Sequence, residues 1–519
     1  MMPVDRGQDL NAQDLIIGSG PSAYAAACAL VAKGRDVLIL DTGFVMDNAA
    51  EALRTRMGST APDQWSTEDR VAIAAVRRSD RSDSIMPFGS DFLFRLPEAM
   101  ADLGDAEEVH GLKPSFARGG LSNGWGASVL PYHSSDFEGW PISLDDLAPH
   151  YQAVAPMIGL AAVRDRLADF YTGLAVTGER VLPQSRQAQE LLKRMENAQG
   201  PLAGLNVQFG TSRQAIAPGC HACAMCLYGC PYRLIFNAGD EVARLVAEGQ
   251  LRYQGGLVVL GFVEDANGVL LETDRGRFRG ERVFIGGGVM PTAKLVLGSL
   301  GLTEEVKILD SQHFYLPMLH RWTGVTSPRD PHHTLAQVFW AINDRQVEDH
   351  VVHTQVYTYN DTYAPDMRHR FGPFAGPARP LIDFLSRRLI VAQAFLHSDS
   401  SPALGARLQN GKLAYRRIEN GSTGAAVLKV RNHLAKVARL SGLMPLKRLL
   451  RLGSLGSSFH CGGSFPMRAN PKPGETDVLG RPSGHKRTHI IDASIFPTIP
   501  APTITFSVMA NAYRIAQDA

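Results

Sequence analysis

The sequence lacks any hydrophobic run long enough to span a lipid bilayer. Its first residues, MMPVDRGQDLNAQ, also lack the apolar core and cleavage site of a secretory signal peptide. No charge of one sign dominates, because 53 Lys and Arg balance 51 Asp and Glu to a net charge of +2, which argues against a nucleic-acid partner. We therefore expect a cytoplasmic protein without a transmembrane segment, and export with a signal-bearing partner subunit stays open.

Cysteine is scarce and unevenly placed. Four of the six cysteines lie between Cys220 and Cys230, while Cys28 and Cys461 stand alone. This clustering excludes a disulfide framework, whose cysteines are spread through a small chain. With 519 residues, of which 45% are hydrophobic, the chain is instead long enough for two domains around a large core.

The sequence opens with a β-α-β pattern. Residues 14–17 (DLII) and 37–40 (VLIL) are typical of buried parallel strands, and residues 21–33 are typical of a helix. Gly18, Gly20 and Ala23 belong to a motif between the first strand and the helix, whose glycines let the backbone approach a pyrophosphate. Asp41, about 20 residues farther on, is suited to bind an adenosine ribose. This pattern predicts a dinucleotide site without deciding between FAD and NAD.

Two later regions alternate in the manner of strands. Residues 251–285 predict a meander, with turns at 266–268 and 275–276, that returns to a buried strand. Residues 310–400 contain runs such as HVVHTQVY at 350–357 and predict a second sheet. The stretch from 50 to 110 is expected to be irregular, and residues 116–132 are expected to form a glycine-rich loop.

Together with this opening, several motifs resemble the glucose-methanol-choline (GMC) oxidoreductase family, whose members bind FAD. They are RGGLSNGWG at 118–126, DF at 136–137 with WPI at 140–142, VFIGGGVMPTAKLVL at 283–297, SFHCGGS at 458–464, IDASIFPT at 491–498 and PTIT at 502–505. The resemblance covers most of the chain. It implies an α/β fold, with a discontinuous Rossmann-like FAD-binding domain and an α+β substrate domain that contains a mixed or antiparallel sheet.

The resemblance also divides the chain into segments. We expect a first FAD-binding segment at 12–48, an irregular cap or substrate segment at 49–109, a flavin-contacting glycine loop at 110–150, a helical region with a cysteine-rich insert at 151–236, a second FAD-binding segment at 237–305, a substrate domain at 306–454, and a C-terminal active-site and FAD-binding segment at 455–519.

By the same resemblance, FAD would be contacted from three of these segments. The residues are Gly119, Gly120, Ser122 and Asn123 in the glycine loop, Val258 at the adenine, Gly288 before a helix, and Asp492 and Thr503 at the pyrophosphate and flavin ring. Some relatives attach the flavin covalently through a histidine just before the loop tryptophan, but this chain has Gly124 there. Non-covalent FAD is therefore expected.

His460 matches the catalytic histidine of the family. It would take the hydroxyl proton of an alcohol while hydride leaves for flavin N5, a task that suits imidazole with its pKa of about 6.5. The family normally places a second His or Asn before the last proline, whereas this chain has Ala501 before Pro502. Three alternatives stay open: another donor such as Asn123 substitutes, the substrate supplies its own contact, or the reaction is not alcohol oxidation.

We expect an FAD-dependent dehydrogenase that oxidises an alcohol, and family membership favours a sugar or polyol. The alternatives are an isomerase or lyase of the same family, or a flavoprotein electron-transfer subunit. Candidate pocket residues, which no motif assigns, are His313, Trp322, Trp340, His353 and Tyr357.

The sequence CHACAMCLYGCP at 220–231 has the spacing of ferredoxin-type iron–sulfur sites. Cys220, Cys223, Cys226 and Cys230 would hold one [4Fe-4S] or [3Fe-4S] cluster, because no second motif exists. A structural zinc site and uncoordinated cysteines are the alternatives. A cluster would pass electrons outward to a cytochrome, a quinone or a carrier protein.

A basic stretch precedes His460. No acidic residue lies between Glu419 and Glu475, while lysines and arginines decorate a leucine-rich helical pattern across 427–451. This pattern indicates either a solvated helix face or a docking surface for anionic lipid, a phosphorylated substrate or an acidic redox partner.

Overall fold

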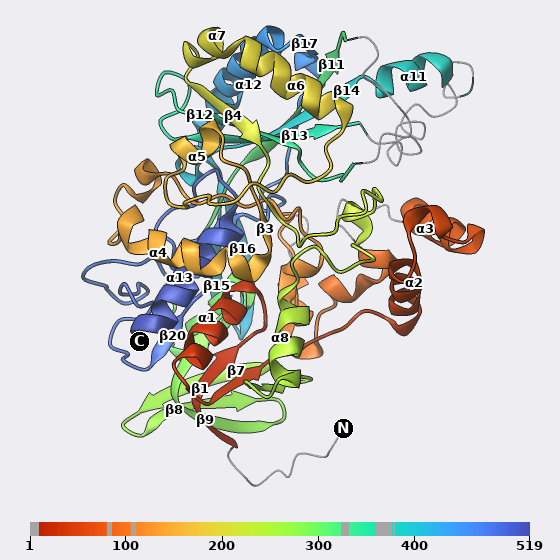
Figure 1. The fold of residues 1–519 in the computed structure, drawn as a ribbon. Helices are drawn as coiled ribbons and strands as arrows, with labels where there is room; N and C mark the ends of the chain where they lie inside the picture. The colour runs from red at the N-terminus through yellow and green to blue at the C-terminus, as the bar shows by residue number, and fades with distance from the viewer. Residues whose placement is uncertain (1–9, 80–85, 105–109, 323–331, 360–375, 377–378) are drawn as a thin grey trace.

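The computed structural model describes residues 10–79, 86–104, 110–322, 332–359, 376 and 379–519. Figure 1 shows two regions built on sheets: β1, β7, β8, β9 and β20 lie in the lower half, and β4, β11, β12, β13 and β14 lie in the upper half. No helix within the described ranges combines the length and the hydropathy that crossing a membrane requires.

The lower sheet is assembled from three distant parts of the chain. Its strand order is β6-β2-β1-β9-β8-β7, and β20 pairs with β9. The elements are β1 (Leu10–Ile17), α1 (Pro21–Ala32), β2 (Val37–Leu40), β6 (Arg252–Gln254), β7 (Val259–Asp265), β8 (Gly268–Thr273), β9 (Gly276–Ile285), α9 (Val289–Ser299), β20 (Thr488–Ile490) and α13 (Ile504–Asp518). The predicted β-α-β opening and the meander are both confirmed, and the C-terminal helix α13 packs beside α1.

The upper sheet is antiparallel, in the order β17-β11-β14-β13-β12-β4, and β18 also pairs with β11. Its strands are β4 (Val207–Thr211), β11 (His313–His320), β12 (Val338–Ile342), β13 (Val352–Thr358), β14 (Leu389–Phe395), β17 (Leu443–Pro445) and β18 (Arg451–Leu452). Helices α6 (Arg186–Asn197) and α12 (Thr423–Leu440) share a buried core with one face of this sheet. On the opposite face, Phe339 and Ala341 of β12 pack with Leu167 of α5 (Arg166–Phe170) in a smaller core.

A smaller antiparallel sheet joins the two regions. Its order is β16-β15-β10-β19, with β10 (Val306–Asp310), β15 (Ala403–Gln409), β16 (Lys412–Ile418) and β19 (Cys461–Gly462). Asp310 at the end of β10 pairs with Cys461 in β19. This pairing places the end of β10 directly beside His460.

The segment 49–109 is less irregular than the sequence indicated. It contains α2 (Asn48–Gly58), α3 (Thr67–Ser79) and several short 3-10 helices. Leu53, Met57 and Phe88 bury their side chains there together with Met225 of the cysteine-rich insert. The helical periodicity of α2 is weak in the sequence because only two of its side chains, Leu53 and Met57, are buried.

The segment 151–236 also departs from expectation. This segment supplies β4 to the edge of the upper sheet. Its helices are the end of α4 (Leu144–Val154), α5, α6 and α7 (Gln199–Ala203), and α8 (Ala238–Ala247) follows it. A strand from this mainly helical segment therefore helps to build the upper sheet.

Candidate active site

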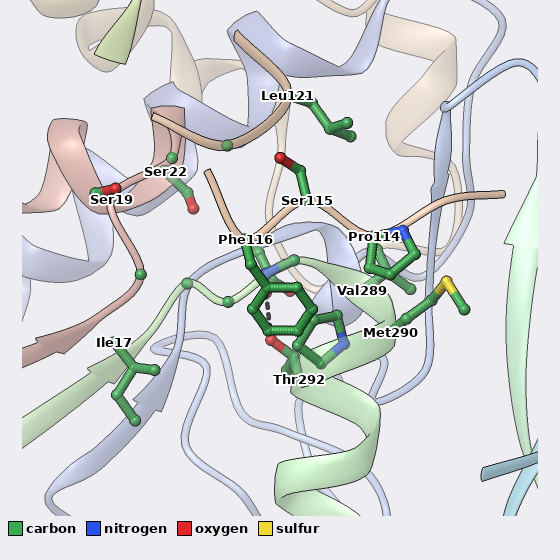
Figure 2. A pocket seen from close by; sticks show the side chains of 18 of the residues that line it. Ile17, Ser19, Ser22, Pro114, Ser115, Phe116, Leu121, Val289, Met290 and Thr292 are labelled. Atoms are coloured by element: carbon green, nitrogen blue, oxygen red, sulfur yellow. Dashed lines mark hydrogen bonds between the residues drawn. The ribbon is translucent and has the colours of Figure 1, made fainter. Parts of the chain in front are cut away.

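One cavity lies at the carboxyl ends of β1 and β9, where the glycine motif meets α9 and the C-terminal segment. Figure 2 labels lining residues from four parts of the chain: Ile17 on β1, Ser19 and Ser22 at the start of α1, Pro114 to Phe116 with Leu121 near the glycine loop, and Val289, Met290 and Thr292 in α9. Of the predicted cofactor residues, those that line the cavity are Gly18, Gly20, Asp41, Gly120, Val258, Gly288 and Asp492.

The two motif glycines serve different purposes. Gly18 has a φ of +90°, and a Cβ there would lie 2.6 Å from the carbonyl oxygen of Gly286, so a side chain is excluded by the protein itself. A Cβ on Gly20 would meet no atom within 4 Å. The space beside Gly20 is therefore open in front of the N–H groups of helix α1, where a pyrophosphate fits.

Asp41 lies in the cavity wall at the end of β2. Its carboxylate accepts hydrogen bonds from the Ser19 hydroxyl and from the Tyr253 hydroxyl, the latter at 3.1 Å. Burial raises the pKa of Asp41 to about 6. The Ser19 oxygen also accepts the Gly119 N–H at 2.9 Å, so this acid connects the glycine motif to the glycine loop.

Asp492 holds the opposite wall in place. Its carboxylate accepts the Gly288 N–H at 2.9 Å, the Thr292 hydroxyl at 2.6 Å and the Ser494 N–H at 2.9 Å. Burial raises the pKa of Asp492. These bonds tie the C-terminal segment to the start of α9, as a two-part dinucleotide site requires.

Other predicted cofactor residues lie behind the cavity wall. Ala23 is fully buried against the Gly286 turn. A Cβ on Gly119 would lie 2.5 Å from the Gly239 nitrogen. The Ser122 hydroxyl donates to the Gly119 carbonyl at 2.6 Å and accepts the Ala238 N–H at 3.0 Å. Thr503 is the N-cap residue of α13, and its hydroxyl is buried without a partner among the described residues.

The side chain of Asn123 is hydrogen-bonded to its own loop and to Asn237. Its amide group donates to the carbonyls of Arg118 at 2.9 Å and Gly120 at 2.8 Å, and its oxygen accepts from the Asn237 amide at 2.8 Å. Both N–H groups are thus used within the glycine loop. These bonds fix the shape of the glycine loop, and the suggested role of Asn123 in place of the missing second catalytic group stays a prediction.

His460 lies between this cavity and the upper sheet. The neighbouring residues Phe459 and Cys461 line the cavity, and Phe459 has a left-handed φ of +57°. The His460 ring stacks on Phe395 at a centroid distance of 4.8 Å, and its Nδ1 is buried without a hydrogen-bond partner in the described chain. Burial, with a smaller contribution from nearby His313, lowers the pKa of His460 to about 3, so the imidazole is neutral at pH 7.

Asp310 positions the loop that carries His460, and no motif in the sequence marked it. Its carboxylate accepts the Gly456 N–H at 2.7 Å, the Ser458 hydroxyl at 2.6 Å and the Cys461 thiol at 3.3 Å. Burial raises the pKa of Asp310. A single buried carboxyl group therefore holds both sides of residue 460.

The face of the upper sheet opposite α6 and α12 contains a group of polar side chains. The register places His313 and His353 on either side of Phe395, and Tyr315 and Gln355 on either side of Gln393. The Gln393 amide donates to the Tyr315 hydroxyl at 3.2 Å. The Tyr357 hydroxyl donates to the Gln355 oxygen at 2.9 Å. We call this set of residues, His313, Tyr315, His353, Gln355, Tyr357 and Gln393, the polar sheet face.

His353 has neither ring nitrogen bonded to any described residue, although its side chain is fully buried. Burial, with a smaller contribution from His460, lowers the pKa of His353 to about 3. The five pocket residues suggested by the sequence therefore lie on two different faces of the upper sheet. His313, His353 and Tyr357 lie on the polar sheet face, whereas Trp322 and Trp340 pack into the opposite core with α6 and α12.

The cysteine-rich insert is folded against α2 and α3. Its four thiols are near enough for the charges of Cys220 and Cys230 to raise the pKa values of Cys223 and Cys226, although burial is the larger cause. No three of these sulfurs come within 4.8 Å of one another.

Comparisons with known proteins agree with this arrangement. Residues 433–512 match the family model described as GMC oxidoreductase. No curated protein sequence matches the chain significantly. Pyridoxine 4-oxidase from Mesorbium loti has a similar structure, with a TM-score of 0.61 and 15% identity over 98% of this chain and 99% of that one.

Two formate oxidase structures are similar to the same extent. One has a TM-score of 0.61 at 13% identity over 98% of both chains. The other, from Aspergillus oryzae RIB40 and solved to study the effect of a mutation on FAD modification, has a TM-score of 0.60 at 13% identity over 98% of both chains. The C-terminal segment 433–512 is therefore similar to the GMC oxidoreductase family, and nearly the whole chain shares the fold of these oxidases.

Proposed function

We propose that this protein oxidises an alcohol group of a polar, polyhydroxylated small molecule, with His460 as the base. The observation that carries this proposal is the position of a neutral His460, whose Nδ1 has no partner among the described residues, between the dinucleotide cavity and the polar sheet face. FAD, bound without a covalent link and held by the residues that line the cavity, would accept the hydride from the substrate carbon. A neutral imidazole nitrogen has the lone pair that takes the hydroxyl proton.

His353 is our candidate for the group that Ala501 does not provide. It is buried, both of its ring nitrogens lack partners among the described residues, and its pKa responds to the charge of His460. A neutral imidazole has one N–H and one acceptor nitrogen. His353 would therefore orient the substrate hydroxyl toward His460.

The polar sheet face supports a sugar or polyol over an aliphatic alcohol. Tyr315, Gln355 and Gln393 present hydroxyl and amide groups side by side across three strands. Such a wall offers several hydroxyl and amide groups to a polyhydroxylated substrate, whereas an aliphatic alcohol would use few of them.

The test is anaerobic mixing of the FAD-loaded enzyme with sugars, polyols and aliphatic alcohols while the oxidised-flavin absorption is followed. We expect sugars or polyols to bleach the flavin, His460→Ala to abolish bleaching with FAD retained, and His353→Gln to slow it. His320→Gln is the matched control, because His320 lies at the far end of β11 and stacks on Trp322. If no alcohol bleaches the flavin, the isomerase or lyase alternative is favoured instead.

We infer further that Cys220, Cys223, Cys226 and Cys230 hold an iron–sulfur cluster. The spacing of these cysteines along the sequence supports a cluster. The distances between their sulfur atoms, no three of which lie within 4.8 Å of one another, support it as well. A single tetrahedral zinc ion, with Zn–S bonds of about 2.3 Å, would draw its thiolates to less than about 4 Å from one another. A cluster of several atoms holds its thiolates farther apart, and it would pass electrons singly to a cytochrome, a quinone or a carrier protein.

Iron, zinc and sulfide analysis of anaerobically purified protein tests this inference. We expect iron and sulfide, lost in Cys226→Ser, while substrate still bleaches the flavin in that variant. The rate with a one-electron acceptor should fall in Cys226→Ser, and the rate with oxygen should be low throughout. Zinc, or no metal at all, would make the cysteines structural, and fast reoxidation by oxygen would indicate an oxidase, as the similar solved proteins are named.

A further inference from the structure

A second cavity, of about 360 Å³, contains two histidines and several carboxylates. It lies between the 3-10 helix η6 (Ser134–Phe137), the residues before β13, and the 3-10 helix η11 (Ser398–Ser400) that follows β14. Neither the dinucleotide cavity nor the polar sheet face includes these residues. The mechanism above assigns them no role.

Three side chains in this cavity converge. Nε2 of His350 lies 3.1 Å from the Asp399 carboxylate, and Nδ1 of His397 lies 3.5 Å from the same oxygen. The two imidazole rings stack at a centroid distance of 3.6 Å. Across the described residues, this is the one group of three histidine, cysteine or acidic side chains whose ligand atoms all lie within 4.8 Å. His397 is buried while the Asp399 side chain is 58% exposed, so an ion could enter from solvent.

A fourth group independently points to a cation. Asp136 is only 3% exposed and lines the same cavity. One of its oxygens accepts the His133 N–H at 2.9 Å, but the other is buried without a partner in the described chain. A buried carboxylate oxygen without a hydrogen bond or a cation is costly. Asp349 adds a further carboxyl group to the wall.

We propose that this cavity binds a divalent transition-metal ion such as Zn²⁺, with His350, His397 and Asp399 as ligands and Asp136 as an additional carboxylate. Imidazole nitrogens combined with carboxylate oxygens suit zinc and its neighbours better than Ca²⁺ or Mg²⁺, which prefer oxygen ligands alone. The ion would brace the chain near the active site. His397 is two residues beyond Phe395, on which His460 stacks, and Thr498 of the C-terminal segment lines the same cavity.

Equilibrium dialysis against Zn²⁺, followed by metal analysis, tests the proposal. We expect Asp399→Asn and His350→Gln to bind one ion fewer than the wild type. Asp349→Asn is the matched control, because it removes the same charge from the same cavity wall without removing a proposed ligand. Circular dichroism and thermal melting establish that each variant is folded, and Zn²⁺ should raise the melting temperature of the wild type more than that of Asp399→Asn.

Co²⁺ separates this site from the cysteines. Co²⁺ bound by histidine and carboxylate gives visible bands without the thiolate charge-transfer bands of a cysteine site, and we expect Asp399→Asn to lose only the former. The proposal is overturned if Asp399→Asn binds as many ions as the wild type, if Asp349→Asn loses as many, or if every bound Co²⁺ shows thiolate bands.

A separate observation concerns the outer edge of the upper sheet. Of the fourteen large hydrophobic side chains exposed among the described residues, eight lie within residues 381–452, so apolar exposure is concentrated there. Leu440, Met444, Leu449 and Leu452 lie at the end of α12 and on β17, a short 3-10 helix and β18, and they are 40–62% exposed. Basic residues alternate with them: Lys436, Arg439, Lys447, Arg448 and Arg451.

We propose that this edge, residues 436–452, docks on an anionic lipid surface. Apolar side chains that enter the interface, flanked by lysines and arginines that contact anionic headgroups, are the features of peripheral membrane binding. The absence of acidic residues between Glu419 and Glu475 removes local repulsion from such a surface. β11 connects this edge to the polar sheet face through the pairing of Tyr315 with Arg451.

Flotation with phosphatidylcholine vesicles, with and without phosphatidylserine, tests this second proposal. We expect binding only to the anionic vesicles, weakened by salt, and reduced about fivefold in Arg448→Gln. Leu449→Ser should also weaken binding, whereas Val263→Ser, which alters an equally exposed valine on β7, should not. Failure of the wild type to bind anionic vesicles, or unchanged binding by Leu449→Ser, would overturn the proposal and leave an acidic protein partner as the alternative.

Discussion

Burial shifts the pKa values of several residues at this site away from their values in water. His313, His353 and His460 are buried around Phe395, and burial lowers the pKa of each. Asp41, Asp310 and Asp492 show the reverse effect, because burial raises the pKa of a carboxyl group. The imidazoles are therefore neutral acceptors, and the carboxyl groups serve to hold loops in place.

The low pKa of His460 predicts an unusual pH profile. Since burial lowers this pKa to about 3, the imidazole keeps its acceptor lone pair well below its unperturbed pKa of about 6.5. We expect kcat/KM to show no acid limb near pH 6.5 and to decline only below about pH 4. A limb near pH 6.5 that is absent from His460→Gln would instead show that His460 is solvated in the working enzyme.

Asp310 should matter to catalysis without touching the substrate. The Asp310 carboxylate accepts hydrogen bonds from Gly456, Ser458 and Cys461. In Asp310→Asn one of its two oxygens becomes an amide nitrogen that cannot accept, so at least one of these bonds is lost. We expect kcat to fall by up to about 100-fold through displacement of His460, with KM and FAD content changed little. Asp265→Asn, which alters a carboxyl group at a surface turn, should leave kcat unchanged. Equal losses in both variants would contradict this role.

At the scale of elements, the turn between β1 and α1 contains one glycine that folding requires and another that cofactor binding requires. Gly18 requires a left-handed φ and leaves no room for a Cβ, whereas Gly20 has a φ of −69° and open space around it. Gly20→Ala should therefore fold normally but lose FAD affinity by at least tenfold, because the methyl group would occupy the place of the pyrophosphate.

Fluorescence titration of the apo-protein with FAD measures this loss, with thermal melting of the apo-protein as the test of folding. Gly178→Ala is the control, since a Cβ there also meets no atom within 4 Å, outside the cavity. An unchanged dissociation constant in Gly20→Ala would mean that the cofactor does not approach this turn.

At the scale of the whole molecule, buried histidines make stability depend on pH. Burial lowers the pKa to about 3 or 4 in His313, His320, His333, His353, His397, His460 and His489. Between the unfolded pKa of about 6.5 and these folded values, the unfolded chain binds more protons, so stability is present above pH 6.5 and is lost as the pH falls. Four buried aspartates with raised pKa values, Asp41, Asp136, Asp310 and Asp492, act in the opposite direction.

We therefore expect the free energy of unfolding to be lower at pH 5 than at pH 7, by at most about 2 kcal/mol for each histidine. Urea titrations at the two pH values measure the difference. His353→Gln should show a smaller dependence on pH than the wild type, because one buried imidazole is removed. A free energy of unfolding that is equal or greater at pH 5 would mean that the aspartates outweigh the histidines.

The sequence by itself determined the features that depend on neighbours along the chain. The β-α-β opening, the glycine turn at 18–20, the meander at 251–285 and the C-terminal motifs were all predicted, because strand and helix periods and turn chemistry act over a few residues. Helix α2 was missed because a short helix with two buried side chains carries little periodic signal.

Only the tertiary structure decided which distant residues meet. The polar sheet face joins β11, β14 and β13 through a register that no single strand reveals, and the same register turns Trp340 to the opposite core. His350, His397 and Asp399 line the same cavity as Asp136, which lies more than 200 residues earlier in the chain. The physical reason is that the sequence determines the chemistry of each side chain position by position, whereas burial of the whole core decides which strands pair. Strand pairing then decides which distant side chains meet.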